Sequence, residues 1–522
     1  MADTQPAADW GYETTPQPGA NNVTMHYPRG KMLAGSSARN FMLYHRATVG
    51  SYKMWADQVG DDSYTWDKFL PYFEKSMTFT PPNQNFRLAN ATPTYITQGL
   101  ADGGPLQLTY PNWAYAFPSW ATKVFSSMGM PLRQDGFSAG GLVGHAYATF
   151  TIDPKTQIRS SSETAFLRNS LDDPNYTVYT MTNAQKIIFD STKTATGVKV
   201  STMDSLPYTL TAKKEVILAA GVIGSPQLLQ VSGVGPAALL KSLNIPVVAD
   251  LPGVGTNMQD HIVYGITNGV NLVTASAFGN SPAFTAQQIA DFNNKASGAM
   301  TSPAADMLAW EKLPNATRSS FSKDSLAKLA KLPADWPEVE YLAFSAYVGN
   351  LDTLNTQDPR DGTNYAAFAA VLVAPQSRGT VMIKSPDASV APVIDPQFLV
   401  DKADIDVAVG SFKRMRDMWN NSALKPIKLG TEKFPGAQIK TDAQILNALK
   451  GNFQTIFHGS STCMMGKSSD PKAVVDTKAR VYKVKNLRVV DAAAFPFLPP
   501  GHPQSTVYAL AEKIACNISG NC

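Results

Sequence analysis

The sequence lacks the features that mark disulfide-rich, zinc-binding, membrane-spanning and nucleic-acid-binding proteins. Three cysteines in 522 residues are too few for a disulfide framework, and no Cys/His cluster has the spacing of a zinc site. No apolar run approaches the roughly 20 residues that a membrane-spanning helix needs. The formal net charge is only +4 and no basic run is dense, which argues against nucleic acid as a partner.

The first residues also lack the basic start and apolar core of a signal peptide. Six Asn-x-Ser/Thr sequons nevertheless favour the secretory pathway, and with it a glycosylated, extracellular protein. Their asparagines are Asn22, Asn90, Asn175, Asn315, Asn420 and Asn517. Among the cysteines, Cys516 and Cys522 are near enough in sequence to pair, which leaves Cys463 free.

The composition is that of a large globular protein. With 44% hydrophobic and 16% charged residues the chain is not disordered, and its length predicts about two to four domain-sized units. Thirty-six glycines and 36 prolines indicate many loops. No internal repeat of fixed period is present, which argues against a solenoid or a propeller.

Two histidines near the C-terminal end form the candidate site. His458 begins His-Gly-Ser-Ser, and His502 lies 44 positions later in Pro-Pro-Gly-His-Pro-Gln, so each stands on a predicted loop beside glycine or proline. A neutral imidazole takes a hydroxyl proton near neutral pH, and a second donor can hold the same oxygen. The alternative is that each is an ordinary, partly buried histidine with a hydrogen-bond partner, but the motif context of the pair favours a site that activates an alcohol. The four remaining histidines are expected to be packed or solvated: His26, His45, His145 and His261.

Small residues gather in two further segments. The small residues of Ala34-Gly35-Ser36-Ser37-Ala38 suit either a backbone that passes close to a bulky ligand or a helix packed tightly on a sheet. The apolar run 214–221 ends in Ala-Ala-Gly, as a buried parallel strand does where it reaches a ligand crevice. Ser225-Pro226 then predicts the start of a helix, with serine as its cap.

The remaining pattern predicts one group of strands before residue 215 and another after residue 360. The predicted strands are 176–182, 186–190, 196–201, 208–212, 366–373, 378–384 and 393–396. Helices are predicted at 284–296, 322–332, 401–421, 441–449 and 505–518. A sheet with helices beyond it fits a second domain that covers the reactive edge of a cofactor.

Four blocks of this sequence, in order along nearly the whole chain, resemble the glucose-methanol-choline (GMC) oxidoreductase family. They are similar in particular to the fungal aryl-alcohol oxidase and glucose oxidase types. The blocks are Pro28–Met42, Ala220–Gly235, Leu251–His261 and Phe457–Ala515.

The resemblance implies an α/β, Rossmann-like FAD-binding domain and an α+β substrate domain with a large antiparallel sheet. The FAD-binding domain is expected to be discontinuous, built from residues 1–60, 170–262 and 470–522. The substrate domain is expected to comprise residues 61–169 and 263–469.

The resemblance also implies roles for single residues. His458 is the expected base for the alcohol proton, and His502 is the second active-site residue. The residues implied to lie against FAD are Gly35, Ser36 and Asn40, then Ala184 by the adenine, Asp491 and Ala492 by the ribityl and pyrophosphate, and Gln504 beside the pyrimidine edge.

The sequence departs from the family pattern at its N-terminal end. The strand, the G-x-G-x-x-G turn and the helix that normally hold the pyrophosphate are not found here. The only similar motif, 233–238, follows a predicted helix and contains a proline. We therefore expect either an incomplete version of a longer protein or a naturally shortened relative, with an exposed sheet edge in both cases.

The implied function is FAD-dependent oxidation of a small-molecule alcohol to an aldehyde or ketone, with oxygen or a quinone-type acceptor reoxidising the flavin. Two alternatives stay open: a non-redox lyase or cyclase on the same flavin scaffold, and an inactive homologue that cannot hold FAD. Phe495 and Phe497, just before His502, are expected either to line the path of the substrate or to pack.

Overall fold

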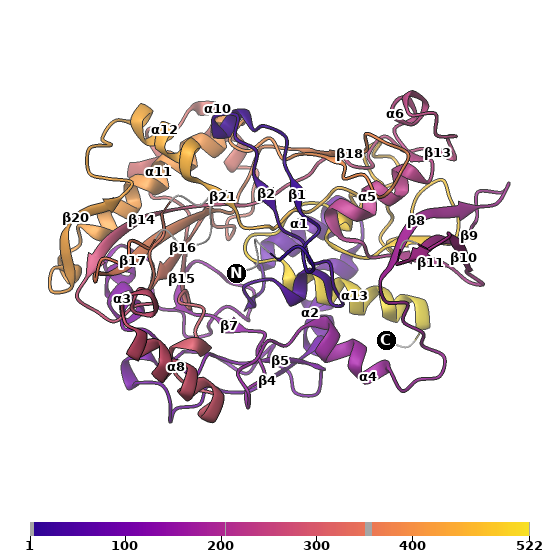
Figure 1. Ribbon diagram of the computed structural model, residues 1–522. Helices are drawn as coiled ribbons and strands as arrows, with labels where there is room; N and C mark the ends of the chain where they lie inside the picture. Colours follow the sequence, from indigo (N-terminus) through magenta and orange to yellow (C-terminus); the bar gives the residue numbers. More distant parts are fainter. Residues whose placement is uncertain (1–4, 204, 350–357, 521–522) are drawn as a thin grey trace.

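A seven-stranded antiparallel sheet forms one side of the molecule (Figure 1), in the computed structural model that describes residues 5–203, 205–349 and 358–520. This large sheet confirms the expected antiparallel sheet. Its strand order is β20-β14-β17-β16-β15-β6, and β21 also pairs with β14. The strands are β20 (Lys428–Phe434), β14 (Ile262–Val270), β17 (Asn364–Leu372), β16 (Val339–Phe344), β15 (Met307–Glu311), β6 (Gly144–Tyr147) and β21 (Gln454–Thr455).

The two central strands of this sheet have little contact with solvent on either face. Every residue of β14 is buried, and so is all of β17 after its first residue. β17 is rich in alanine, and these small side chains let helix α11 (Lys402–Trp419) pack closely across the sheet. The indole of Trp419 donates to Ile266 O of β14 at 2.9 Å, which fixes the end of the helix on the sheet.

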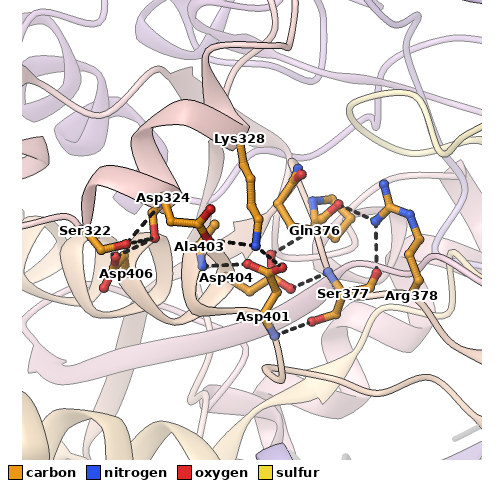
Figure 2. A network of polar contacts seen from close by, with 12 residues as sticks. Ser322, Asp324, Lys328, Gln376, Ser377, Arg378, Asp401, Ala403, Asp404 and Asp406 are labelled. Carbon is orange, nitrogen blue, oxygen red and sulfur yellow. Dashed lines mark hydrogen bonds and ion pairs between the residues drawn. The ribbon is translucent and has the colours of Figure 1, made fainter.

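A polar network fixes the start of α11 (Figure 2). The buried Asp404 carboxylate accepts the backbone N–H groups of Gln376 (2.7 Å) and Ser377 (2.9 Å). Lys328 of α10 (Lys323–Leu329) contacts Asp401, the N-cap of α11, at 2.7 Å. Since Gln376 and Ser377 follow β17, these contacts join the large sheet, α10 and α11 in one unit, which holds β16 and its side chains in place.

The other side of the molecule contains short strands together with helices α5 (Gly221–Val231), α6 (Ala237–Ser242) and α13 (Gln504–Ser519) (Figure 1). Strand β11 (Val216–Leu218) pairs in parallel with β22 (Leu487–Val489). Beside them stands an antiparallel sheet of β8 (Thr182–Phe189), β9 (Ala195–Thr202) and β10 (Tyr208–Thr211). The predicted strand over 176–182 is wrong, because the chain is irregular and exposed up to residue 181 and β8 begins only at Thr182.

Helix α5 (Gly221–Val231) begins four residues before the predicted start, so the interpretation of Ser225-Pro226 as its cap is wrong. A proline inside a helix removes the N–H that would bond to the carbonyl four residues earlier. Here that carbonyl belongs to Val222, and the Thr462 hydroxyl donates to it at 2.7 Å. The bond lost to Pro226 is thus replaced by one from the segment that carries His458.

The remaining elements surround these two sides. Helix α13 (Gln504–Ser519) matches the predicted C-terminal helix and packs on α2. The other helices are α1 (Val49–Val59), α2 (Trp66–Ser76), α3 (Phe117–Ser127), α4 (Arg168–Ser170), α6 (Ala237–Ser242), α7 (Ala277–Asn280), α8 (Pro282–Lys295), α9 (Asn315–Arg318) and α12 (Asp442–Asn452).

Short two-stranded sheets complete the fold. The pairs are β1 (Tyr12–Glu13) with β2 (His26–Tyr27), β3 (Leu43–Tyr44) with β7 (Thr149–Phe150), β4 (Met77–Phe79) with β5 (Leu106–Leu108), β12 (Val234–Gly235) with β13 (Ala249–Asp250), and β18 (Thr380–Met382) with β19 (Val393–Asp395). Cys516 is disulfide-bonded and Cys463 is free, whereas Cys522 lies outside the described residues. Within the described ranges, none of the helices combines the length and apolar content that a bilayer crossing needs.

Candidate active site

Four histidines from distant parts of the sequence form one cluster. The rings of His458 and His502 lie edge to face with centroids 4.7 Å apart. His261 packs on His458 at 5.3 Å, and His45 packs on His502 at 5.4 Å. We call these four residues the histidine cluster. In the described part of the chain, no group of three or more His, Cys, Asp or Glu side chains is arranged to hold a metal ion.

Glu340 of β16 supplies the carboxylate of the cluster. Its Oε1 accepts from His502 Nε2 at 3.0 Å, and its side chain is fully buried. The other oxygen, Oε2, is buried without a hydrogen-bond partner. Since a carboxylate accepts and does not donate, Nε2 of His502 carries a hydrogen.

The backbone of His502 is held by His45. The amide N–H of His502 donates to His45 Nε2 at 2.9 Å, so this nitrogen presents its lone pair. The hydrogen of a neutral His45 therefore sits on Nδ1, which contacts its neighbour's carbonyl, Arg46 O, at 3.1 Å. Gly501 makes the close approach possible: it has φ of +96°, and a Cβ there would lie 2.0 Å from His45 Cε1.

Asp260 fixes the backbone of the other two histidines. Its Oδ1 accepts the N–H of His261 and the N–H of His458, both at 2.8 Å. Its Oδ2 accepts from the Tyr27 hydroxyl at 2.6 Å and from the Thr455 hydroxyl. A buried carboxylate with four donors is a rigid anchor, so the loop that carries His458 has little freedom to move.

Three imidazoles of the cluster are held neutral. Burial, followed by the charge of His502, lowers the pKa of His458 and of His261 well below the usual value. The same two causes lower the pKa of His45 to about 3. Within the cluster, the ring that contacts a carboxylate is that of His502, which lies beside Glu340. His458 is therefore neutral near pH 7 and has a free lone pair.

The lowered pKa of His45 predicts a fold that loses stability in acid. A histidine that stays neutral in the folded state makes its full contribution to the free energy of unfolding above the unfolded pKa of about 6.5. This contribution to stability falls as the pH drops toward 3. At pH 5 we expect His45 alone to lower the free energy of unfolding by about 2 kcal/mol relative to pH 7.5.

Denaturant unfolding at pH 7.5 and at pH 5 measures this loss of stability. In His45→Gln the difference in free energy of unfolding between the two pH values should be smaller by about 2 kcal/mol. The same pH dependence in both proteins would contradict the assignment.

The residues expected at the cofactor are spread over several elements. Gly35 and Ser36 open a short 3-10 helix (Gly35–Ala38), and Ala184 lies on β8. Asn40 and Gln504 are in contact, because the Asn40 amide donates to Gln504 Oε1 at 2.9 Å. Gln504 is the first residue of α13 and stands two positions after His502, so this contact links the cofactor segment to the histidine cluster.

Asp491 and Ala492 lie just after β22, where the chain meets the start of α5. The Asp491 carboxylate accepts from Gly221 N (2.9 Å), Ser225 Oγ (2.6 Å) and Ala493 N (2.7 Å). Burial raises the pKa of this carboxyl group, and the hydrogen bonds oppose the rise. Asp491 therefore joins the segment after β22 to the small residues at the start of α5.

Open backbone at both segments fits a bulky planar cofactor. Gly35 and Gly221 have φ of +51° and +77°, and a Cβ at either position would meet no atom within 4 Å. Ile217, in the middle of the parallel strand β11, is 49% exposed, although parallel strands are normally covered on both faces. The open backbone at Gly35, and at Gly221 beside the anchored Asp491, leaves room for a cofactor of the size of FAD.

Sequence reasoning missed half of the histidine cluster. His45 and His261 were expected to be packed or solvated, and they contact the predicted pair directly. The signal that could have found His261 is its place at the end of the third family block, directly after an aspartate. Phe495 and Phe497 pack in the core against Trp55, and Phe497 also packs against Trp336.

Comparison with known proteins agrees with this architecture. Patulin synthase of Penicillium expansum is 54% identical over 524 residues, which cover 100% of this chain and 83% of that protein. A solved FAD-dependent oxidoreductase from Chaetomium thermophilum has a TM-score of 0.86 at 28% identity and covers 98% of this chain and 90% of its own. A fungal aryl-alcohol oxidase shares the fold, with a TM-score of 0.85 at 24% identity over 97% of this chain and 88% of its own.

The fold and these comparisons define a flavin-dependent oxidoreductase, and its cofactor is FAD. The chain belongs to the GMC oxidoreductase family, whose models match residues 12–263 and 375–511.

Proposed function

We propose that the protein oxidises an alcohol to an aldehyde or ketone, with His458 as the base and His502 as the second donor to the alcohol oxygen. The observation that carries this proposal is the 4.7 Å contact between the two rings, one neutral and one beside Glu340. Such a pair can bind one hydroxyl oxygen from two sides.

In this mechanism the histidines act on the alcohol proton. His458 Nε2 accepts the hydroxyl proton, while Nδ1 of His502 donates to the same oxygen as negative charge develops. This donation needs a hydrogen on both ring nitrogens of His502, and the Glu340 carboxylate accepts the one on Nε2. FAD supplies the acceptor for the hydride that leaves the alcohol carbon.

The residues that would hold FAD are those around the open backbone. Gly35 and Ser36 leave room for the ring system and pyrophosphate, and Ala184 would face the adenine. Asp491 and Ala492 would border the ribityl chain, and Gln504 would border the pyrimidine edge. Gln504 also donates to Leu43 O, and this bond orients its amide.

A panel of primary and secondary alcohols tests the proposal. The FAD-loaded protein should yield aldehyde or ketone and consume oxygen or a quinone-type acceptor in equal amount. Product formed while the flavin stays oxidised would instead favour the non-redox lyase or cyclase. A protein that stays colourless after reconstitution with FAD would contradict the whole proposal.

We also propose that the protein is secreted and glycosylated. All six sequon asparagines are exposed, so an oligosaccharide can reach each one without unfolding. We expect the protein from a fungal secretory host to lose apparent mass on endoglycosidase treatment. Asn315→Gln should remove one glycan and leave activity unchanged. An unaltered mass after treatment would contradict glycosylation.

A further inference from the structure

His261 makes a direct hydrogen bond to the proposed base. The Nδ1 atoms of His261 and His458 lie 3.1 Å apart, although the residues are 197 positions apart in the sequence. Asp260 accepts the backbone N–H of both residues, so the two rings are held from one carboxylate. His261 is fully buried and directly precedes strand β14 of the large sheet. The fold therefore holds the two rings in contact.

Two neutral imidazoles that meet through Nδ1 need one hydrogen between them. Burial and the charge of His502 lower the pKa of both His261 and His458, so the neutral forms prevail. Either His458 donates and keeps a lone pair on its Nε2, or His261 donates and His458 carries its hydrogen on Nε2. Only the first arrangement lets Nε2 take a hydroxyl proton.

We propose that His261 is a positioning residue that accepts the Nδ1–H of His458, and so presents the Nε2 lone pair of His458 to the alcohol. The proposal rests on the proposed function of His458. In the step, the alcohol O–H bond breaks and its electron pair stays on oxygen. An N–H bond forms at His458 Nε2, and the original hydrogen stays on Nδ1, bonded to His261.

The surrounding charges make this acceptor necessary. When His458 takes a proton it becomes a cation next to the His502 ring, in a region where Arg29 adds further positive charge. Among the described residues, the hydrogen-bond partner of the His458 ring is His261 Nδ1. A neutral acceptor there stabilises the new cation at the point where the repulsion is strongest.

The other ring nitrogen of His261, Nε2, is buried without a hydrogen-bond partner. In the proposed arrangement this nitrogen carries the hydrogen of His261, since Nδ1 accepts from His458. His145 has an unpaired, buried Nε2 as well, so the two histidines are matched in this respect and differ in their contact with His458.

Histidine tautomers in the FAD-loaded protein test the inference without turnover. Nitrogen-15 NMR on histidine-labelled protein should show His458 protonated at Nδ1 and not at Nε2, with His458→Asn identifying the signals. In His261→Leu we expect this signature to weaken or to change to the Nε2–H form.

Kinetics provide a second readout. His261→Leu should lower kcat about 10²-fold and change KM less than about threefold, because the loss falls on proton transfer and not on binding. His261→Asn, whose side-chain oxygen can still accept, should recover at least about tenfold of that loss. His145→Leu is the matched control, since His145 is also fully buried but lies outside the cluster, and its kcat should stay within about threefold.

The two proposals fail in different ways. An Nε2–H tautomer on resting His458, or a kcat of His261→Leu within threefold of wild type, overturns the role of His261. If His458→Asn itself keeps full activity, the proposed function fails first. Equal losses in His261→Leu and His145→Leu would show a general effect of removing a buried histidine, which also overturns the inference.

Discussion

Replacing His458 with asparagine should lower kcat by about 10²–10⁴-fold, because the alcohol proton loses its acceptor. KM should change less than about threefold, since the ring of His502 and the rest of the site remain. Asparagine is smaller than histidine and can still satisfy polar neighbours, so the fold should persist. Steady-state rates with the best alcohol of the panel measure the effect.

FAD content and thermal unfolding of His458→Asn should match the wild type, which separates a chemical defect from misfolding. His145→Asn, a buried histidine outside the cluster, should keep its kcat. If kcat of His458→Asn is unchanged, or if only its KM changes, another group takes the proton.

Replacing Gly501 with alanine should have the largest effect on structure and rate together. The new Cβ would lie 2.0 Å from Cε1 and 2.7 Å from Nε2 of His45, with Trp310 at 3.1 Å behind it. With φ at +96° the alanine is also strained. We expect the free energy of unfolding to fall by about 3 kcal/mol. We expect kcat to fall at least about 10²-fold, because His502 must shift with its backbone.

A double-mutant cycle tests the cause of this loss. In a His45→Ala background the clash is gone, so Gly501→Ala should cost at least about 1 kcal/mol less than it does alone. Gly430→Ala is the matched control, because Gly430 also has positive φ (+62°) but no atom lies within 4 Å of the added Cβ. Additive losses in the cycle would contradict the proposed contact.

The sequence was most informative where chemistry and local pattern coincide. The large antiparallel sheet, helix α13 and the GMC family were predictable from apolar periodicity and from long motifs. The nearness of His458 and His502 was also expected, because both lie in the family block 457–515, which implies that they share one active site. The strand predicted over 176–182 failed because tyrosine and threonine there suggest a strand, whereas none of the described strands pairs with 176–181.

The partners of the two histidines could not be predicted from the sequence. Glu340 is the second residue of β16 and interrupts an otherwise apolar buried strand, and only the sheet register brings it to His502. His45 meets His502 across 457 positions, through a contact that depends on Gly501. Such contacts depend on which distant segments of the chain lie side by side in the fold. The periodicity of the sequence does not show this.

The anaerobic reaction of the FAD-loaded wild type with a panel of alcohols, followed by flavin absorbance, tests the central claim most directly. The account predicts bleaching with at least one alcohol, one aldehyde or ketone formed per flavin bleached, and a rate at least about 10²-fold lower in His458→Asn. Full flavin absorbance with every alcohol, or equal bleaching rates in the two proteins, would contradict it.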